Sequence, residues 1–231
     1  MSTQHSQIPP ETAMAGVPAH VRHVLSRLHA ESLAQEAKIS PSDYTKPTAA
    51  DEMRDKFIAL EEDKAQYVYT LCRATGAHNI VEAGTSYGVS TIYLALAAAA
   101  NAKASGRKAR VVATEHEPTK AAKAREYWKE CGEEVAGVID LREGDLRETL
   151  KHGLEDVDLL LLDIWTPMAL PTLKVVQPKM RPGAVVITDN TIGSASGYED
   201  LLNYLRGPDS KFISLTLPYH KGLEMSVYLP N

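Results

Sequence analysis

The stretch VEAGTSYGVST, residues 81–91, lies between an apolar run and a helix-like segment, and its interpretation decides the fold. The apolar residues before Gly84 and the helical pattern after Gly88 predict a strand, a tight turn and a helix. As a G-x-S-x-G motif, the turn is typical of the nucleophile elbow of a hydrolase, with Ser86 as the attacking group. As a glycine-containing turn from strand to helix, it is instead a cradle for a nucleotide-like cofactor, and Ser86 is only part of the wall.

Short apolar runs alternate with helical segments from Ile80 onward. Strands are expected at residues 80–83, 110–114, 138–141, 157–162 and 184–188, and helices at 86–101, 118–131, 146–152, 170–180 and 198–206. Strands that are apolar at consecutive positions and alternate with helices imply a parallel sheet covered on both faces. Two further runs, 212–217 and 223–229, are too close together for a crossover helix and predict a hairpin. The predicted fold class is α/β: a Rossmann-like, doubly wound, seven-stranded sheet, mostly parallel, with an antiparallel C-terminal hairpin strand and additional N-terminal helices.

The N-terminal part of the chain has a different pattern. Apolar residues at helical spacing predict a helix over 17–38, and a second stripe around Phe57 predicts a helix over 51–75. The prolines between them indicate a connector. We therefore divide the chain into a polar N-terminus expected to be disordered (1–16), an N-terminal helix and connector (17–50), and one main domain (51–231).

Composition and charge limit the classes of function. The chain has 231 residues, 44% hydrophobic residues and a formal net charge of -5, which is typical of one globular domain without a global positive field. We therefore expect no nucleic-acid partner. The N-terminus lacks the pattern of a secretory signal, and the longest apolar stretch, 92–100, is about half the ~20 residues that a membrane span needs. We expect a cytoplasmic protein without a membrane partner, in which Cys72 and Cys131 are buried thiols in a reducing compartment.

Acidic residues recur where the expected parallel strands end. They are Glu82 and Glu115 on the first two strands, Asp145 after the third, Asp163 after the fourth, and Asp189 with Asn190 after the fifth. Each alone is explained by a helix cap or a turn. Together they lie at the sheet edge where open α/β sheets bind ligands, and a carboxylate at the end of the second strand is well placed for a ribose.

The hydrolase interpretation has support of its own. The order Ser86, then Asp163 or Asp189, then His220 matches that of an α/β-hydrolase triad. No H-G-G-G-like segment upstream supplies oxyanion donors, however, and His220 lies in a hairpin. The cofactor interpretation lacks the G-x-G-x-x-G spacing of dinucleotide sites, but a cofactor without a pyrophosphate does not need it. The shared position of the acidic residues favours the cofactor site.

Five segments together resemble the class I S-adenosylmethionine-dependent methyltransferases, and more closely the small O-methyltransferases of the catechol and caffeoyl-CoA type. The segments are VEAGTSYGVST (81–91), ATEHEP (113–118), REGDL (142–146), VDLLLLDIWT (157–166) and RPGAVVITDN (181–190). The resemblance implies transfer of a methyl group from S-adenosylmethionine to a hydroxyl oxygen of a small molecule. The first fifty or so residues vary among relatives and often act as a lid or a dimer contact, so a homodimer is a further expectation.

The resemblance also implies roles for individual residues. Along the methionine half of the cofactor it places Glu82, Gly84, Ser86 and Ser90; Glu115 would hold the ribose, and His116 and Asp145 would border the adenine. Asp163, Asp189 and Asn190 match the positions that hold a divalent cation in metal-dependent members. Such a set of oxygen donors suits Mg²⁺, which lowers the pKa of a bound acceptor oxygen. If no ion binds, Asp163 contacts the cofactor's ammonium group instead.

One position departs from the catechol-type pattern. Relatives of this type carry a lysine general base three residues after the first metal aspartate, and here that position is Thr166, which cannot take up a proton near neutrality. Either the metal alone acidifies the acceptor, or a group such as His220 or Lys221 reaches in, or the acceptor is not a catechol. Asp163 and His220 are therefore the catalytic candidates, and a phenol or enol is the expected acceptor. A serine hydrolase and a catalytically inactive cofactor-binding protein remain as alternatives.

Overall fold

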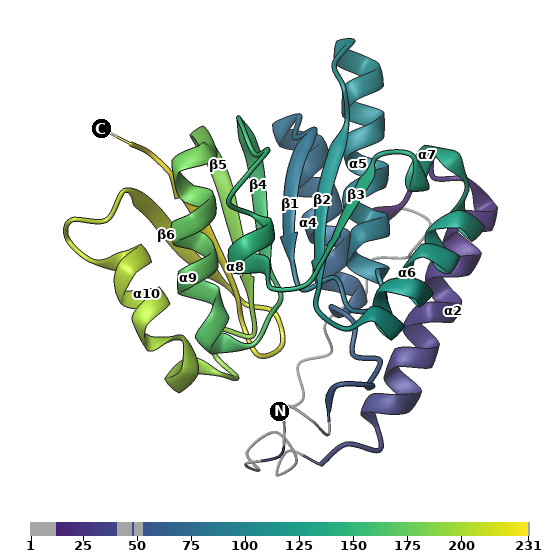
Figure 1. Cartoon of the computed structure of the whole chain (residues 1–231), viewed down its shortest axis with the longest axis horizontal. Helices are drawn as coiled ribbons and strands as arrows, with labels where there is room; N and C mark the ends of the chain where they lie inside the picture. The colour runs from purple at the N-terminus through teal and green to yellow at the C-terminus, as the bar shows by residue number, and fades with distance from the viewer. Residues whose placement is uncertain (1–12, 41–47, 49–52, 231) are drawn as a thin grey trace.

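The computed structural model describes residues 13–40, 48 and 53–230 and contains a central seven-stranded sheet with helices on both faces (Figure 1). The spatial order of the strands is β3-β2-β1-β4-β5-β7-β6. β1 to β5 are parallel, and β7 pairs antiparallel with both β5 and β6. The strands are β1 (Asn79–Ala83), β2 (Arg110–Glu115), β3 (Ile139–Glu143), β4 (Val157–Leu162), β5 (Met180–Asp189), β6 (Phe212–Leu217) and β7 (Leu223–Tyr228). The predicted fold class is confirmed.

Two hydrophobic cores separate the helices into two layers. One layer has α2 (Ala19–Glu36), α4 (Glu62–Thr75), α5 (Val89–Ser105), α6 (Pro118–Cys131) and α7 (Glu133–Ala136); the other has α8 (Leu146–Thr149), α9 (Thr166–Val176) and α10 (Glu199–Arg206). Short 3-10 helices lie at Gln177–Lys179 and Ala195–Tyr198. Neighbouring strand residues enter different cores: Ile80 packs in the first and Val81 in the second. Burial on both faces explains why the strands are apolar at consecutive positions.

The helix expected over 51–75 begins only at Glu62, so its first part is a wrong prediction. Residues 56–61 are not helical, although Phe57 and Leu60 are buried as the apolar stripe suggested. Side chains of α2 satisfy the backbone here: Phe57 N–H donates to Gln35 Oε1 at 3.1 Å and Ala59 N–H donates to Ser32 Oγ at 2.9 Å. These long-range bonds replace the hydrogen bonds that a helix would have made.

The predicted N-terminal helix is present as α2, within the expected bounds. Its Arg27 forms an ion pair with Glu130 at the end of α6, at 2.6 Å. Met14 is buried just before the helix, so the packed chain begins slightly earlier than residue 17. The expectation of disorder over residues 1–12 lies outside the described residues.

Two expectations from composition concern membrane spans and thiols. In residues 13–40 and 53–230, no helix is long and apolar enough to cross a membrane. Cys72 and Cys131 are free and buried, and burial raises the pKa of each thiol to about 12. Both are therefore unreactive packing residues, as predicted.

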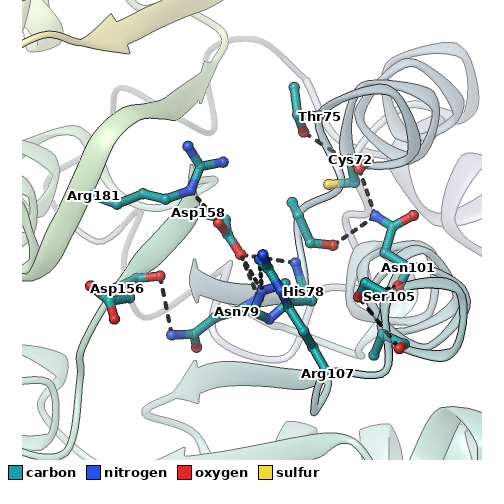
Figure 2. A network of polar contacts seen from close by, with 12 residues as sticks. Cys72, Thr75, His78, Asn79, Asn101, Ser105, Arg107, Asp156, Asp158 and Arg181 are labelled. Atoms are coloured by element: carbon teal, nitrogen blue, oxygen red, sulfur yellow. Dashed lines mark hydrogen bonds and ion pairs between the residues drawn. The ribbon is translucent and has the colours of Figure 1, made fainter.

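The amino-terminal end of the sheet is held together by Asp158 of β4 (Figure 2). One carboxylate oxygen accepts hydrogen bonds from the backbone N–H groups of His78 and Asn79, each at 2.9 Å, and the other pairs with Arg181. Burial alone would raise the pKa of Asp158, but the Arg181 guanidinium and the two N–H groups outweigh it and lower the pKa. Asp158 thus ties the start of β1 to β4 and β5.

We expect Asp158→Ala to lower the free energy of unfolding by about 3 kcal/mol at pH 7, because Arg181 and two buried N–H groups lose their partner. The folded-state pKa lies below the unfolded one, so this stability is present above the unfolded pKa, about 4, and is lost as pH falls through the folded pKa. Urea unfolding at pH 7 and at pH 3 measures both effects, with the exposed Asp209→Ala as control. The same loss at both pH values would contradict this account.

Candidate functional site

A cavity of about 630 Å³ lies at the carboxyl ends of the parallel strands, which is a volume typical of small-molecule sites. Residues 84–87, 114–117, 144–147, 163–166 and Asn190 line it, so the loops after all five parallel strands contribute. Residues 53–60, which precede α4, form a further wall. The sheet topology therefore brings together most of the residues that the sequence suggested.

The turn from β1 to α5 depends on two glycines. Gly84 has a φ of 89°, and a Cβ there would overlap the carbonyl oxygen of Asp163. Gly88 has a φ of 80°, and its carbonyl oxygen accepts a hydrogen bond from Trp128 Nε1 at 2.9 Å. Only glycine combines these positive φ values with such close contacts, so the loop lies directly against the end of β4.

Ser86 lies at the tip of this turn with a φ of 50° and lines the cavity. Its backbone N–H donates to Glu115 Oε2 at 2.7 Å. His220, the base expected for a hydrolase triad, is not among the lining residues: its side chain is 74% exposed, and its Nδ1 lies 3.4 Å from Glu61 Oε1. The structure therefore does not bring His220 to the cavity beside Ser86.

Glu82 was expected beside the cofactor, but its carboxylate faces the interior and does not line the cavity. It accepts hydrogen bonds from the hydroxyl groups of Thr85 at 2.8 Å, Ser90 at 2.6 Å and Thr91 at 2.5 Å. Burial raises the pKa of Glu82, and the three hydroxyl groups oppose this rise. Glu82 thus connects Thr85 in the turn with Ser90 and Thr91 at the start of α5.

Glu115 and Asp145 line the cavity from the next two loops, with His116 between them in the lining. The Glu115 carboxylate accepts three backbone hydrogen bonds, from Ser86, His116 and Glu117, at 2.7–2.9 Å. Asp145 caps α8 and pairs with Arg147 at 2.6 Å, and this hydrogen bonding lowers the pKa of Asp145 to about 2. Two carboxylates therefore line the cavity, one on the β2 loop and one on the β3 loop.

A second group of charges surrounds the ends of β4 and β5. Asp163 and Asn190 line the cavity, whereas Asp189 is buried behind them. One Asp189 oxygen lies 2.5 Å from Lys64 Nζ, and the other accepts a hydrogen bond from Asn190 Nδ2 at 2.7 Å. Lys64 Nζ also lies 2.9 Å from Glu61 Oε2. An ammonium group thus lies directly on one of the three expected cation ligands.

The pKa shifts in this group follow from burial and from the shared lysine. Burial and the neighbouring carboxylate of Asp189 raise the pKa of Asp163 well above its usual range. Burial likewise raises the pKa of Asp189, although Lys64 opposes the rise. Burial alone would lower the pKa of Lys64, but Asp189 and Glu61 outweigh it and raise the pKa, so the ammonium stays charged. Ionisation of the Asp163 carboxyl is therefore disfavoured by burial and by the neighbouring Asp189.

Several aromatic side chains line the cavity. Trp165 is 48% exposed at the start of α9 and lines the cavity beside Thr166. Phe57 and Tyr87 also line the cavity, with their rings tilted by 31° and their centroids 4.6 Å apart. Thr166 fills the position of the family lysine and packs against Gly197. These surfaces suit a flat, partly apolar ligand.

Two parts of the site were missed in the sequence. Segment 53–60 was assigned to a helix and is instead a wall of the cavity. Lys64 follows three acidic residues at the start of α4 and was not singled out in the sequence, but its side chain is fully buried. Its partner Asp189 is 125 positions away, so no local pattern could have indicated the contact.

Comparison with known proteins identifies the region around this cavity. Residues 81–191 match the family model described as "Methyltransferase domain". The catechol O-methyltransferase of Niastella koreensis is 25% identical over 139 residues, which cover 58% of this chain and 59% of that protein. The catechol O-methyltransferase of Mycobacterium tuberculosis is 30% identical over 138 residues, with 58% of each chain covered. The matched part of the chain therefore spans about three-fifths of the length of each of these curated relatives.

Solved structures agree on the fold. The O-methyltransferase from Bacillus cereus, determined in complex with S-adenosylhomocysteine, superposes with a TM-score of 0.67 over 94% of this chain and 94% of its own. Its sequence identity is 18%, so this similarity concerns the fold. The structural similarity agrees with the fold, and the matches to the methyltransferase model and to the two catechol O-methyltransferases agree with the resemblance that the five segments suggested.

Proposed function

We propose that this chain, which carries a class I S-adenosylmethionine-dependent methyltransferase domain, transfers a methyl group from S-adenosylmethionine to a hydroxyl oxygen of a small phenolic or enolic molecule. The observation that carries the proposal is that the Gly84 turn, Glu115 and Asp163 all line the same cavity. A compact site at this sheet edge is what an adenosyl cofactor requires.

The cofactor would extend along the loops after β1 to β3. Its methionine part would lie against Gly84 and Ser86, its ribose on Glu115, and its adenine between His116 and Asp145, all of which line the cavity. To bind both ribose hydroxyls, Glu115 would have to exchange some of its backbone hydrogen bonds for cofactor hydrogen bonds. Ser90 also lines the cavity beside the proposed methionine part, and its hydroxyl donates to Glu82. Glu82 itself would act indirectly, by holding Thr85, Ser90 and Thr91 in place.

The protein's contribution to transfer is chiefly alignment. The sulfonium methyl group is already activated, so the acceptor oxygen has to be held behind the methyl carbon and kept deprotonated. Trp165 and the aromatic wall would orient a flat acceptor and exclude water. Asp163, between the region proposed for the cofactor and the region proposed for the acceptor, would contact the acceptor or the cofactor's ammonium group.

The donor set at the ends of β4 and β5 fits a divalent cation such as Mg²⁺. Within the described residues no three His, Cys, Asp or Glu side chains form a metal cluster, so Asn190 would have to be the third ligand beside Asp163 and Asp189. Asn190 Oδ1 is buried and lacks a hydrogen-bond partner in the structure, which is the state expected of an amide oxygen whose partner is a ligand. A bound ion would acidify the acceptor oxygen, and such a role is compatible with Thr166 in place of a lysine base.

The assay that tests this proposal uses S-adenosylmethionine, a panel of phenols and enols, and the variant Ser86→Ala. We expect methylated product with the wild type, and we expect Ser86→Ala to retain activity within about tenfold, because a typical hydrogen bond of a neutral hydroxyl group contributes only about 1 kcal/mol. Labelling of Ser86 by a serine-directed phosphonate would favour the hydrolase alternative. Cofactor binding without product on any acceptor would favour a catalytically inactive binding protein.

Other expectations from the sequence stay predictions. They are a cytoplasmic location, a homodimer, and a lid or dimer contact formed by residues 17–50. Residues 41–47 and 49–50 of that segment lie outside the described part of the chain.

A further inference from the structure

We propose that Lys64 is a built-in counter-ion of Asp189, which competes with a divalent cation for this carboxylate and keeps the affinity of the candidate cation site low. The inference rests on the proposed function, because it takes Asp163, Asp189 and Asn190 as the ligands of such a cation. It concerns a residue of α4, outside the five segments that carry the family resemblance.

The contact is a buried, two-sided ion pair. The Lys64 side chain is 0% exposed and the Asp189 side chain 3% exposed, and their Nζ and Oδ1 atoms are 2.5 Å apart. Glu61 lies on the other side of the ammonium group, at 2.9 Å. A buried ammonium is costly unless it is paired. If Lys64 moved away from Asp189, the ion pair with Glu61 would have to compensate its charge.

The second oxygen of Asp189 is also engaged. Asn190 Nδ2 donates to it at 2.7 Å, while Asn190 Oδ1 has no hydrogen-bond partner within the described residues. A cation would have to reverse this arrangement by turning the Asn190 oxygen toward itself. Without a cation, the Asp189 carboxylate thus contacts one ammonium group and one amide N–H group. An entering ion has to displace the amide N–H group and bind close to the ammonium group.

Electrostatics gives the direction of the effect. A divalent ion on Asp189 would lie within a few ångströms of the Lys64 ammonium, where the repulsion between like charges is only partly screened. Removing the ammonium would therefore raise the affinity for the ion. Removing Glu61, which is 28% exposed, takes a negative charge from the same neighbourhood and would lower the affinity.

The test measures Mn²⁺ binding by electron paramagnetic resonance, without cofactor or acceptor, so that the readout does not depend on turnover. We expect Lys64→Met to bind Mn²⁺ at least about tenfold more tightly than the wild type, and Lys64→Arg, which keeps the charge, to stay within about threefold of it. Glu61→Gln is expected to bind about threefold or more weakly than the wild type. Lys151→Met, at an exposed i, i+3 pair with Glu148, controls for a general change in net charge.

Lys64→Met leaves Asp189 buried without its counter-ion, so its fold is checked by circular dichroism. If this variant does not fold, Glu61→Gln decides the question through the Mn²⁺ affinity and through the rise in melting temperature that Mn²⁺ causes. Unchanged or weaker Mn²⁺ binding by folded Lys64→Met, unchanged binding by Glu61→Gln, or no Mn²⁺ binding to any variant would overturn the inference. Binding of S-adenosylhomocysteine, measured on the same samples, reports separately whether the proposed function fails.

Discussion

Gly84→Ala is expected to reduce the affinity for S-adenosylhomocysteine by at least about a hundredfold and to lower the free energy of unfolding by about 3 kcal/mol. A Cβ at this position would overlap the carbonyl oxygen of Asp163, and the φ of 89° is unfavourable for any residue with a side chain. The clash is with backbone, so it forces the turn away from the end of β4. Isothermal titration calorimetry and urea unfolding measure the two effects.

Gly106→Ala is the matched control. Gly106 ends α5 with a φ of 70°, but a Cβ there would meet nothing within 4 Å. We expect this variant to lose about 1 kcal/mol of stability, from backbone strain alone, and to retain the wild-type affinity for S-adenosylhomocysteine. If Gly84→Ala behaves like Gly106→Ala in both measurements, the turn is not the cofactor cradle.

Asp189→Ala is expected to lower the free energy of unfolding by about 3–5 kcal/mol at pH 7, because it removes one partner of a buried ion pair. Lys64 would keep Glu61, which is partly exposed and so compensates only in part. The cavity left by the carboxylate adds to the loss. Urea unfolding, with the midpoint and the slope both determined, gives the size of the effect.

The double variant Lys64→Met with Asp189→Ala is the control for this prediction. With the ammonium removed as well, Lys64 no longer leaves a buried positive charge without its Asp189 partner, and we expect the double variant to recover about 2 kcal/mol relative to Asp189→Ala alone. Additive losses in the double variant would show that the two side chains do not depend on each other, contrary to the 2.5 Å contact.

Much of the fold follows from local patterns in the sequence. The strands were predictable because each is buried on both faces, as at Leu159 and Leu160, whose side chains enter different cores. The helix expected over 51–75 was wrong in its first part because helical spacing of apolar residues shows burial rather than backbone conformation. What decides the conformation there is the pairing of Phe57 and Ala59 with Gln35 and Ser32, which is a long-range contact.

The candidate site was predictable to a similar degree. Parallel strands end at one edge, so Glu115, Asp145 and Asp163 had to converge, and they do line one cavity. Side-chain direction was not predictable: Glu82 faces three hydroxyl groups in the interior, and His220 faces Glu61 at the surface. Both directions depend on the packing of neighbouring elements.

The measurement that tests the central claim most directly is a calorimetric titration of the purified chain with S-adenosylhomocysteine. The account predicts saturable binding of one molecule per chain, which Gly84→Ala weakens by at least about a hundredfold and Ser86→Ala retains. No heat of binding at millimolar concentrations, well above ordinary enzyme affinities, would contradict the assignment of this cavity to an adenosyl cofactor.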